Sequence, residues 1–535
     1  MEGEVAPREL TPPPIQAPTA KEKKYDRQLR LWAAAGQRAL EESHVLLVVG
    51  EDEEGSSSSV AGAETLKNLI LPSIGNFTIA DAATVRDEDL GVNFFLEDSS
   101  LGKSRAEETK RLLEELNPDV TGHAISESLS EWLPRYDSLK PYNLFIICGA
   151  TQAIHSICTY ASKYGVPVIH IQCVGFYAAF SIQLPEEFPI VDTHPDPETT
   201  QDLRLLQPWK ELTDMVQELG DISKMSNHDH GHIPYLVILL YYLKEWQDTH
   251  DGQAPSTFKE KTAFRDFVRD KARTSNPEGG EENFDEACAA VLKSISEPPV
   301  GSGCKDMFAL DSCSYASITA ESANFWVIAH SIRQFYEKHG VLPLPGSVPD
   351  MKATSEGYIK LQNIYKSKAR KDVAEVTDTV RSLEKSLSRA SPIDSAEIEA
   401  FCKNASHVRV LTNPGNKPLP TARFMFKASV DPIAYVALKA ALELDFNDMV
   451  PIYIALNQQY LSQNVESWTS DEEKQGLIDK CTEEVRRAKG AEMHNISSVT
   501  GGMVAQEAIK LLTRQYVPVE GVCVFDGIRA KAGVV

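Results

Sequence analysis

The chain has 535 residues, enough for two or three domains, and 42% of them are hydrophobic, enough to build sizeable cores. Its formal net charge of −23 argues against nucleic-acid binding, because neutralising phosphates requires clustered Lys and Arg. The nine cysteines are scattered without Cys-x-x-Cys spacing, so neither a metal site nor a redox dithiol is predicted. The apolar run at 233–243 is shorter than the ~20 residues of a membrane helix. With no signal peptide in view, we expect a cytoplasmic or nuclear protein.

The chain begins with a proline-rich stretch. Residues 1–20 carry five prolines and little apolar content, which predicts a disordered tail. A basic, amphipathic helix follows, beginning near Lys21 with KEKKYDRQLRLW and running towards Leu40. Residues 44–49 (HVLLVV) then form a β-branched apolar run that ends at Gly50 and predicts a buried strand.

Strands and helices alternate in the next part of the chain. The pattern predicts helices at 64–71 and 105–116, and strands at 77–79, 144–148 and 166–171. Such alternation indicates a parallel, doubly wound sheet.

The pattern changes after about residue 180, where few convincing strands remain. Helices are predicted at 234–246, 263–271, 284–294, 323–337 and 372–388. A long helix at 495–514 and a strand at 522–525 then return to the first domain. We therefore expect a tail over 1–20, an α/β domain over 21–178, a mostly helical insertion over 179–486 and a return segment over 487–535.

The turn after the first predicted strand is the most informative candidate site. A strand–glycine–helix turn normally holds phosphates on free backbone N–H groups. Here the turn is long, GEDEEGSSSSVAGAE, and four carboxylates at 51–54 stand where a polyphosphate would lie. Their charge favours a disabled nucleotide pocket. The alternative is a solvated loop swung away from an intact pocket. Asp81 ends the second strand, where it would either bind a ribose or cap a turn.

Two other features allow more than one interpretation. His228, His230 and His232 alternate in NHDHGHIPY, but three ligands in a polar loop favour capping and solvation over a metal ion. The helix at 495–514 carries an apolar stripe, with Gly501 and Gly502 allowing a close helix contact. That stripe is explained either by core packing or by a partner surface.

An ordered series of motifs resembles the ubiquitin-like activating enzymes. KYDRQLRLW (24–32), GAETLKNLILPSIGNFTIAD (62–81) and LGKSRAEE (101–108) resemble the opening of these adenylation enzymes. VPDMKATSEGYIKLQNIYKSKARKD (348–372) and GGMVAQEAIKLLTRQYVP (501–518) resemble the regulatory, non-catalytic subunits of neddylation activating enzymes. The resemblance implies a Rossmann-like adenylation-type domain, with the helical insertion standing where catalytic members carry their catalytic-cysteine domain.

The chain departs from the catalytic members at several points. Val92 and Asn93 occupy positions where the family's ATP-contacting run has Arg and Gln, although Lys103 is retained. Cys402 is the nearest candidate nucleophile by position, but AEIEAFCKN is typical of an ordinary helix. The chain also stops soon after Phe525, without a terminal ubiquitin-like domain. These departures predict a subunit that binds no nucleotide or metal itself.

The resemblance also implies a heterodimer with a catalytic subunit that binds ATP and Mg²⁺ and forms a thioester with the ubiquitin-like modifier for cullin neddylation. In such enzymes the inactive half lends an arginine from the YDRQLR helix, and the matching residue here is Arg27. A guanidinium there would stabilise transition-state charge. Arg30 shares its helical face, and Tyr25, Arg30 and Trp32 are candidates for the partner interface. The alternative for this segment is a solvated basic helix end packed by Tyr25 and Trp32.

Readings from other classes are disfavoured by particular features. A freestanding adenylyltransferase would need the acidic turn to bind ATP. A nicotinamide-dependent oxidoreductase would need a compact glycine turn. The sumoylation counterpart would lack the long helical insertion. A pure scaffold subunit remains the alternative if Arg27 has no role.

Overall fold

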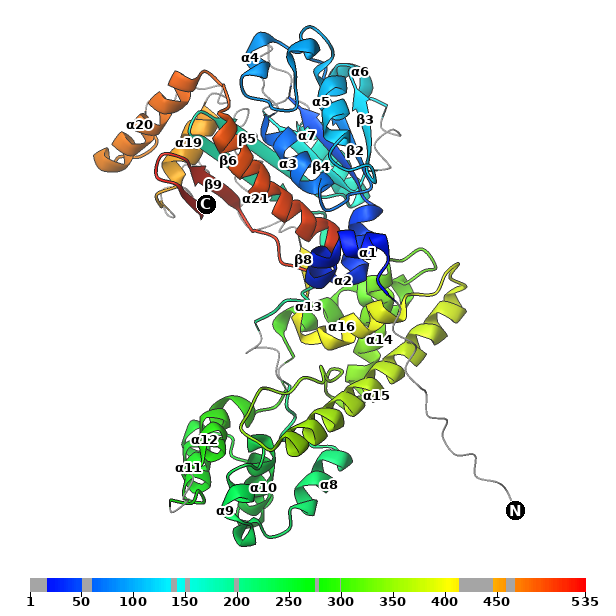
Figure 1. Cartoon of the computed structure of the whole chain (residues 1–535), viewed down its shortest axis with the longest axis vertical. Coiled ribbons are helices and arrows are strands. Elements are labelled where there is room, and N and C mark those ends of the chain that lie inside the picture. Colours follow the sequence, from blue (N-terminus) through cyan, green and yellow to red (C-terminus); the bar gives the residue numbers. More distant parts are fainter. Residues whose placement is uncertain are drawn as a thin grey trace. The chain divides into compact units, whose positions relative to one another are not determined.

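The computed structural model describes residues 17–50, 60–135, 142–149, 154–196, 202–274, 279–298, 300–412, 446–458 and 467–535 (Figure 1). Most of the predicted tail and the acidic residues 51–54 lie outside these ranges. The chain divides into two compact units, one formed by residues 1–187 and 412–535 and the other by residues 188–411. Along the described ranges, no helix is long and apolar enough to cross a membrane.

The first unit is built on an eight-stranded sheet with the order β10-β9-β6-β5-β4-β1-β2-β3. Its strands are β1 (His44–Val49), β2 (Asn76–Ala80), β3 (Thr121–Ile125), β4 (Leu144–Cys148), β5 (Val168–Val174), β6 (Tyr177–Gln183), β9 (Val522–Asp526) and β10 (Lys531–Val534). The five neighbouring strands β3, β2, β1, β4 and β5 pair in parallel. β6 pairs antiparallel with both β5 and β9, and β10 pairs antiparallel with β9.

The α/β fold class with a large helical insertion is confirmed. The strands predicted at 44–49, 77–79, 144–148 and 166–171 lie in the parallel part of the sheet, and the structure adds an antiparallel part to it. Only Gly175 and Phe176 separate β5 from β6, and Gly175 has a positive φ of 56°. A two-residue connection can join only antiparallel strands, because a parallel pair needs a crossover of a dozen residues or more.

Helices cover both faces of this sheet. They are α1 (Ala20–Lys24), α2 (Asp26–Glu41), α3 (Val60–Ile70), α4 (Asp87–Leu90), α5 (Arg105–Glu114), α6 (Leu129–Trp132), α7 (Ile154–Tyr164), α19 (Val450–Gln458), α20 (Glu472–Ala488) and α21 (His494–Thr513), with a 3-10 turn η1 (Asp98–Ser100). Leu46 of β1 packs in a core with Trp132 of α6 and Ile157 of α7. Leu47 points to the opposite face, where it meets α3 at Gly62. The sheet is therefore doubly wound.

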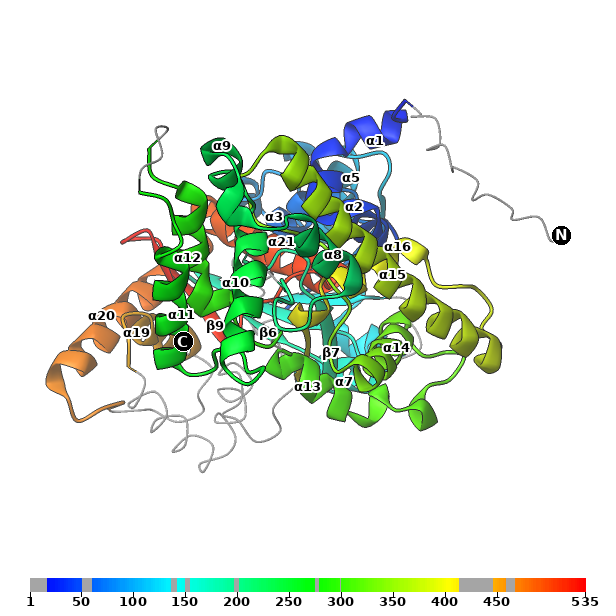
Figure 2. The same cartoon turned by 90° about the horizontal axis from the view of Figure 1, so that it is seen from below.

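The chain returns to the sheet unit earlier than the predicted boundary at residue 487. Figures 1 and 2 both show α19 and α20 side by side near β9, and their apolar residues share a core with Val522 and Val524 of that strand. The compact-unit boundary falls at residue 412. The pattern of α19 and α20 is helical, and a helical pattern alone does not reveal which core a helix joins.

The second unit is mostly helical. Its elements are β7 (Glu187–Val191), α8 (Lys210–Glu218), η3 (Ile222–Lys224), α9 (Asn227–His230), α10 (Tyr235–Thr249), α11 (Phe258–Arg269), α12 (Glu282–Ser294), α13 (Ser302–Ala309), η4 (Asp311–Cys313), η5 (Tyr315–Ser317), α14 (Asn324–His339), α15 (Ser355–Leu387), α16 (Ser395–Lys403), η6 (Ala405–His407) and β8 (Val408–Thr412). Strands β7 and β8 pair with each other.

Helix α15 links two hydrophobic cores of the second unit. Leu361 and Tyr365 lie in a core with α10 and α12, whereas Val376 and Val380 lie in a core with α14 and α16. The helix begins at Ser355 rather than at 372, because no proline interrupts residues 355–387 and Thr354 caps its first turn.

Candidate functional site: a sheet edge and a basic helix

The start of α2 carries the predicted arginine. Arg27 is exposed and makes no hydrogen bond or ion pair with any residue that the structure describes. Arg30 is also exposed, but its guanidinium pairs with Asp26 one turn earlier, at 3.0 Å. The two arginines therefore differ: among the described residues the Arg30 guanidinium has an ion-pair partner and the Arg27 guanidinium has none.

Two of the predicted interface residues are buried in their own chain. Tyr25 is 2% exposed and Trp32 is 8% exposed, and the indole N–H of Trp32 donates to Gln37 Oε1 at 3.1 Å. These side chains offer a partner almost no surface, so their assignment as interface residues gives way to a packing role. Helix α2 kinks at Trp32 and Ala33, where Ala33 has a φ of 55°.

The carboxyl edge of the sheet is where a doubly wound fold binds nucleotides. Gly50 follows β1 and donates its N–H to Cys148 O of β4 at 2.8 Å. At the N-terminus of α3, the N–H of Ala61 donates to Glu492 Oε2 at 2.9 Å. The same carboxylate oxygen accepts a hydrogen bond of 2.6 Å from the Ser497 hydroxyl, and Glu492 is buried. A side chain of the protein itself thus caps the helix end that would hold a phosphate.

Asp81, the candidate ribose ligand, is also engaged internally. Its two oxygens accept hydrogen bonds from Arg105 of α5, at 2.6 Å from Nε and 3.2 Å from Nη2. Arg105 also pairs with Asp89, at 3.1 Å. Burial, the largest single influence, lowers the pKa of Arg105, but Asp81 and Asp89 together raise it. The carboxylate is held by a buried, bidentate ion pair, and the N–H of Ala83 supplies a further turn-capping bond of 3.0 Å.

The segment that departs from the family's ATP-contacting run is folded onto this edge. Val92 O lies 3.0 Å from His494 Nδ1, and Phe94 stacks on the His494 ring at 3.8 Å. Asn93 is buried, and its Oδ1 accepts the N–H of Phe95 at 3.0 Å. Lys103 is exposed and lies 3.7 Å from Glu108. The partners of this segment are thus His494, the Phe95 backbone and Glu108.

Two positions of this edge where a nucleotide would be bound are occupied by side chains of the protein itself. A phosphate at the start of α3 would lie against the Glu492 carboxylate, and the two charges would repel each other in a buried setting. A ribose at Asp81 would have to displace Arg105. The sequence indicated a disabled pocket from residues 51–54, which lie outside the described ranges. Glu492 was missed, because nothing in the local pattern reveals a contact with Ala61 across 431 positions.

The cysteines show no environment that would activate a thiol. Cys402 is fully buried in the core around α14 and α16, and burial raises its pKa to about 12. Burial also raises the pKa of Cys148 and Cys173 well above the ordinary value, with a further contribution from nearby Glu492. A buried, protonated thiol is a poor nucleophile.

The alternating histidines have separate roles. His230 is buried and its Nδ1 lies 2.8 Å from Glu281, whereas the rings of His228 and His232 lie against each other, tilted by 34°, with their centroids 4.3 Å apart. The three imidazoles therefore do not converge on one point.

Helix α21 has two different faces. A Cβ on Gly501 would lie 2.7 Å from Glu64 Cβ and 2.9 Å from the backbone nitrogen of Thr65, so this glycine permits close packing on α3. A Cβ on Gly502 would meet open space, and neighbouring Val499 is 48% exposed. Core packing explains the Gly501 face only.

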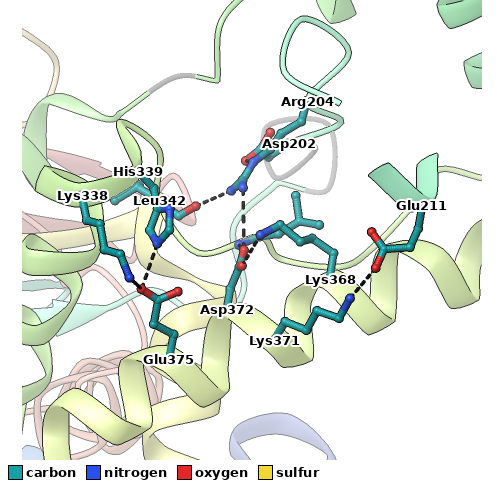
Figure 3. Close-up of polar contacts among 11 residues, drawn as sticks. Asp202, Arg204, Glu211, Lys338, His339, Leu342, Lys368, Lys371, Asp372 and Glu375 are labelled. Carbon is teal, nitrogen blue, oxygen red and sulfur yellow. Dashed lines mark hydrogen bonds and ion pairs between the residues drawn. The ribbon is translucent and has the colours of Figure 1, made fainter. Parts of the chain in front are cut away.

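A buried charge cluster lies on α15 between the two cores of the second unit (Figure 3). Asp372 accepts hydrogen bonds from Lys368 at 2.6 Å and from the N–H of Leu344 at 3.0 Å, and it lies 3.7 Å from Arg204. Arg204 also pairs with Asp202 at 3.0 Å. These opposite charges are paired with one another, so the cluster connects the middle of α15 to the segment around Arg204.

Comparison with known proteins agrees with the fold. Residues 25–531 match the ThiF family model, which places the chain in the ThiF family. It is 35% identical to the NEDD8-activating enzyme E1 regulatory subunit of Danio rerio, covering 95% of this chain and 97% of that protein. The Xenopus laevis protein of the same name is 35% identical over 93% and 95%. The regulatory subunit AXR1 of Arabidopsis thaliana is 32% identical over 95% of both.

These similarities extend over nearly the whole of each protein. The chain belongs to the family of NEDD8-activating enzyme E1 regulatory subunits.

Proposed function

We propose that this chain is the non-catalytic half of a heterodimeric activating enzyme. Its catalytic partner binds ATP and Mg²⁺, adenylates the C-terminal glycine of the NEDD8-type modifier, and receives the modifier as a thioester for transfer towards cullins. The complex works in the cytoplasm or the nucleus. This chain stabilises the partner and completes its adenylation site in trans.

One observation carries the non-catalytic assignment. The Glu492 carboxylate caps the start of α3 through the N–H of Ala61 at 2.9 Å, in the place where a phosphate would bind. The Asp81–Arg105 ion pair supports the same conclusion, because it occupies the candidate ribose ligand. Cys402 supplies no alternative nucleophile, since its thiol is buried and protonated.

Arg27 is the residue that acts across the dimer in this proposal. Its guanidinium is exposed and unpaired among the described residues, so it is available to a negatively charged group on another subunit. A guanidinium donates two parallel hydrogen bonds to phosphate oxygens, and such donors stabilise charge that develops in a transition state.

The partner-facing surface lies around the start of α21. Three apolar side chains there are unusually exposed: Phe94 at 67%, Val499 at 48% and Ile528 at 59%. Large apolar residues gathered on a surface are typical of an interface. Gly502 adds room for close approach, because nothing lies within 4 Å of its missing Cβ.

The test is modifier-dependent ATP–pyrophosphate exchange. We expect no exchange by this chain alone and robust exchange with the partner. The exchange rate of the Arg27→Ala complex should be lower by on the order of 10²-fold, which is the effect of removing one transition-state donor. Arg30→Ala is the matched control, because the Arg30 guanidinium is paired with Asp26. Its exchange rate should fall by less than about threefold.

Each contrary result points to a different function. Exchange by the chain alone would make it a freestanding adenylyltransferase. Silence of the chain alone, with an undiminished Arg27→Ala complex, would reduce it to a scaffold subunit.

A further inference from the structure

We infer that Tyr25, Asn117 and Asp119 are positioning residues that hold the first turn of α2 so that Arg27 is presented in a fixed place. This inference rests on the proposed function of Arg27. The three residues bring together the start of α2 and the turn between α5 and β3, which are more than 90 positions apart in the chain.

The first part of the anchor is the buried Tyr25 hydroxyl. It donates to Asp119 Oδ2 at 2.9 Å and accepts from Asn117 Nδ2 at 3.1 Å. Asn117 Nδ2 also donates to the carbonyl of Ile70 at 2.9 Å, so the network reaches the end of α3. The hydroxyl is thus tied to two neighbouring elements, and its ring is buried.

Lys24 adds a second connection to the same turn. Its Nζ donates to Asp119 Oδ2 at 2.6 Å and to Asn117 Oδ1 at 2.8 Å. Hydrogen bonds from Lys24 and Tyr25 lower the pKa of Asp119, which keeps its carboxylate ionised. Lys24 and Tyr25 are therefore tied to this turn by side-chain hydrogen bonds to both Asn117 and Asp119, and the bond from Asn117 to Ile70 connects the turn to the end of α3.

The other end of this helical turn is fixed at Trp32. Its carbonyl accepts a hydrogen bond of 3.0 Å from Gln515 Nε2, and its indole N–H donates to Gln37. Gly36 leaves room for this packing, because a Cβ there would lie 2.7 Å from Trp32 Cβ. The helix kinks at Trp32 and Ala33, so residues 26–31 form a short segment anchored at both ends.

In this arrangement the backbone around Arg27 is anchored, while its side chain is exposed and has no partner among the residues that the structure describes. If this segment were only a solvated helix end that carries two exposed arginines, it would not need a buried anchor on each side. A transition-state donor, by contrast, must be placed to within a fraction of an ångström, and a displacement of about 1 Å costs on the order of 10²-fold in rate. The anchor supplies that placement without touching the guanidinium.

The experiment measures exchange by the intact heterodimer with Asp119→Asn and Tyr25→Phe. Both variants keep the shape of the side chain and weaken or remove one anchor contact. We expect kcat for exchange to fall about tenfold while the KM for ATP stays within twofold, since ATP binds to the partner. Glu107→Gln is the matched control: its carboxylate pairs with Lys110 at 3.1 Å on α5, is similarly exposed, and should leave kcat unchanged.

A double-mutant cycle separates positioning from general damage. If Asp119 acts through Arg27, then Asp119→Asn should slow exchange little further when Arg27 is already alanine. An equal loss in both backgrounds, or a normal kcat for both Asp119→Asn and Tyr25→Phe, would overturn the inference. If Arg27→Ala itself is undiminished, the proposed function of Arg27 fails and the positioning role fails with it. If Arg27→Ala is slow and the anchor variants are normal, the positioning role alone fails.

Discussion

Two groups of charged residues in the sheet unit differ in how their charges are satisfied. At the carboxyl edge of the sheet, Glu492 and Asp81 are buried and bound to Ala61 and Arg105 of the same chain. At the start of α2, the backbone is anchored, but the Arg27 guanidinium is left exposed and unpaired among the described residues. The first group has become part of the protein's own structure, and the second is available to another molecule.

If the sheet edge binds no nucleotide, as proposed, the difference illustrates how a binding fold can lose its ligand and keep its architecture. A helix N-terminus needs an acceptor, and a carboxylate held by the protein satisfies it as well as a bound phosphate would. Asp81, the candidate ribose ligand, is likewise satisfied by a group of the protein, the Arg105 guanidinium. We therefore expect the buried, paired charges to contribute to the stability of the chain and the exposed charge of Arg27 to contribute to activity.

The largest expected effect contrasts two arginines. Arg105→Ala leaves Asp81 buried without its partner, and we expect the free energy of unfolding to fall by about 4 kcal/mol. Arg27→Ala should change it by less than about 0.5 kcal/mol, because that side chain is exposed. Urea denaturation followed by circular dichroism measures both values. A stable Arg105→Ala protein would remove the distinction between structural and functional charge.

The next effect concerns Glu492. Glu492→Ala removes the buried carboxylate to which Ala61 and Ser497 donate, and we expect a loss of about 3 kcal/mol in the free energy of unfolding. Glu492→Gln keeps an acceptor and should lose less. Neither variant should gain affinity for ATP in equilibrium dialysis, because Asp81 remains paired with Arg105. Tight ATP binding by Glu492→Ala would show that one side chain alone closes a working pocket.

The smallest effect compares the two glycines of α21. Gly501→Ala forces a Cβ against the backbone of α3, and we expect the free energy of unfolding to fall by about 2 kcal/mol. Gly502→Ala meets open space and replaces a helix-disfavouring residue, so it should gain up to about 1 kcal/mol in the isolated chain. A weaker heterodimer with Gly502→Ala, measured by calorimetric titration, would place this face in the interface. Equal effects of the two changes on stability would contradict the two-faced description of α21.

Much of the α/β framework could be predicted from the sequence. The apolar run at 44–49 is β1 to the residue, and 144–148 is β4, because buried parallel strands are short and continuously hydrophobic. β3 (TGHAI) was missed, since it is an edge strand with a glycine and a histidine and only one buried residue. The chain reversal at Gly175 was missed because it depends on backbone conformation more than on composition.

The candidate site was predictable only in part. The resemblance in YDRQLR pointed to Arg27 as the arginine that acts across the dimer, which stays a prediction. The ion pair of Arg30 with Asp26 could not be predicted, since it depends on side-chain conformation. Tyr25 and Trp32 were interface candidates because they lie in the motif that carries the resemblance, and the alternative given for them was packing; tertiary packing buries both. Asn117 and Asp119 carried no signal at all: an Asn-Pro-Asp turn is common, and only the fold brings it to Tyr25.

The cap on α3 also has a consequence for how the chain is made. Ala61 and Glu492 are 431 positions apart, and Gly501, which packs on the same helix, lies further still towards the C-terminus. Contacts of such high sequence separation form late and slowly. During synthesis, α3 therefore emerges long before Glu492 and α21 have been made. Until then, the apolar surface of α3 that packs on α21 stays exposed. Premature termination before Ala491 would leave it uncovered permanently, which makes the last turns of the polypeptide the step that completes the first domain.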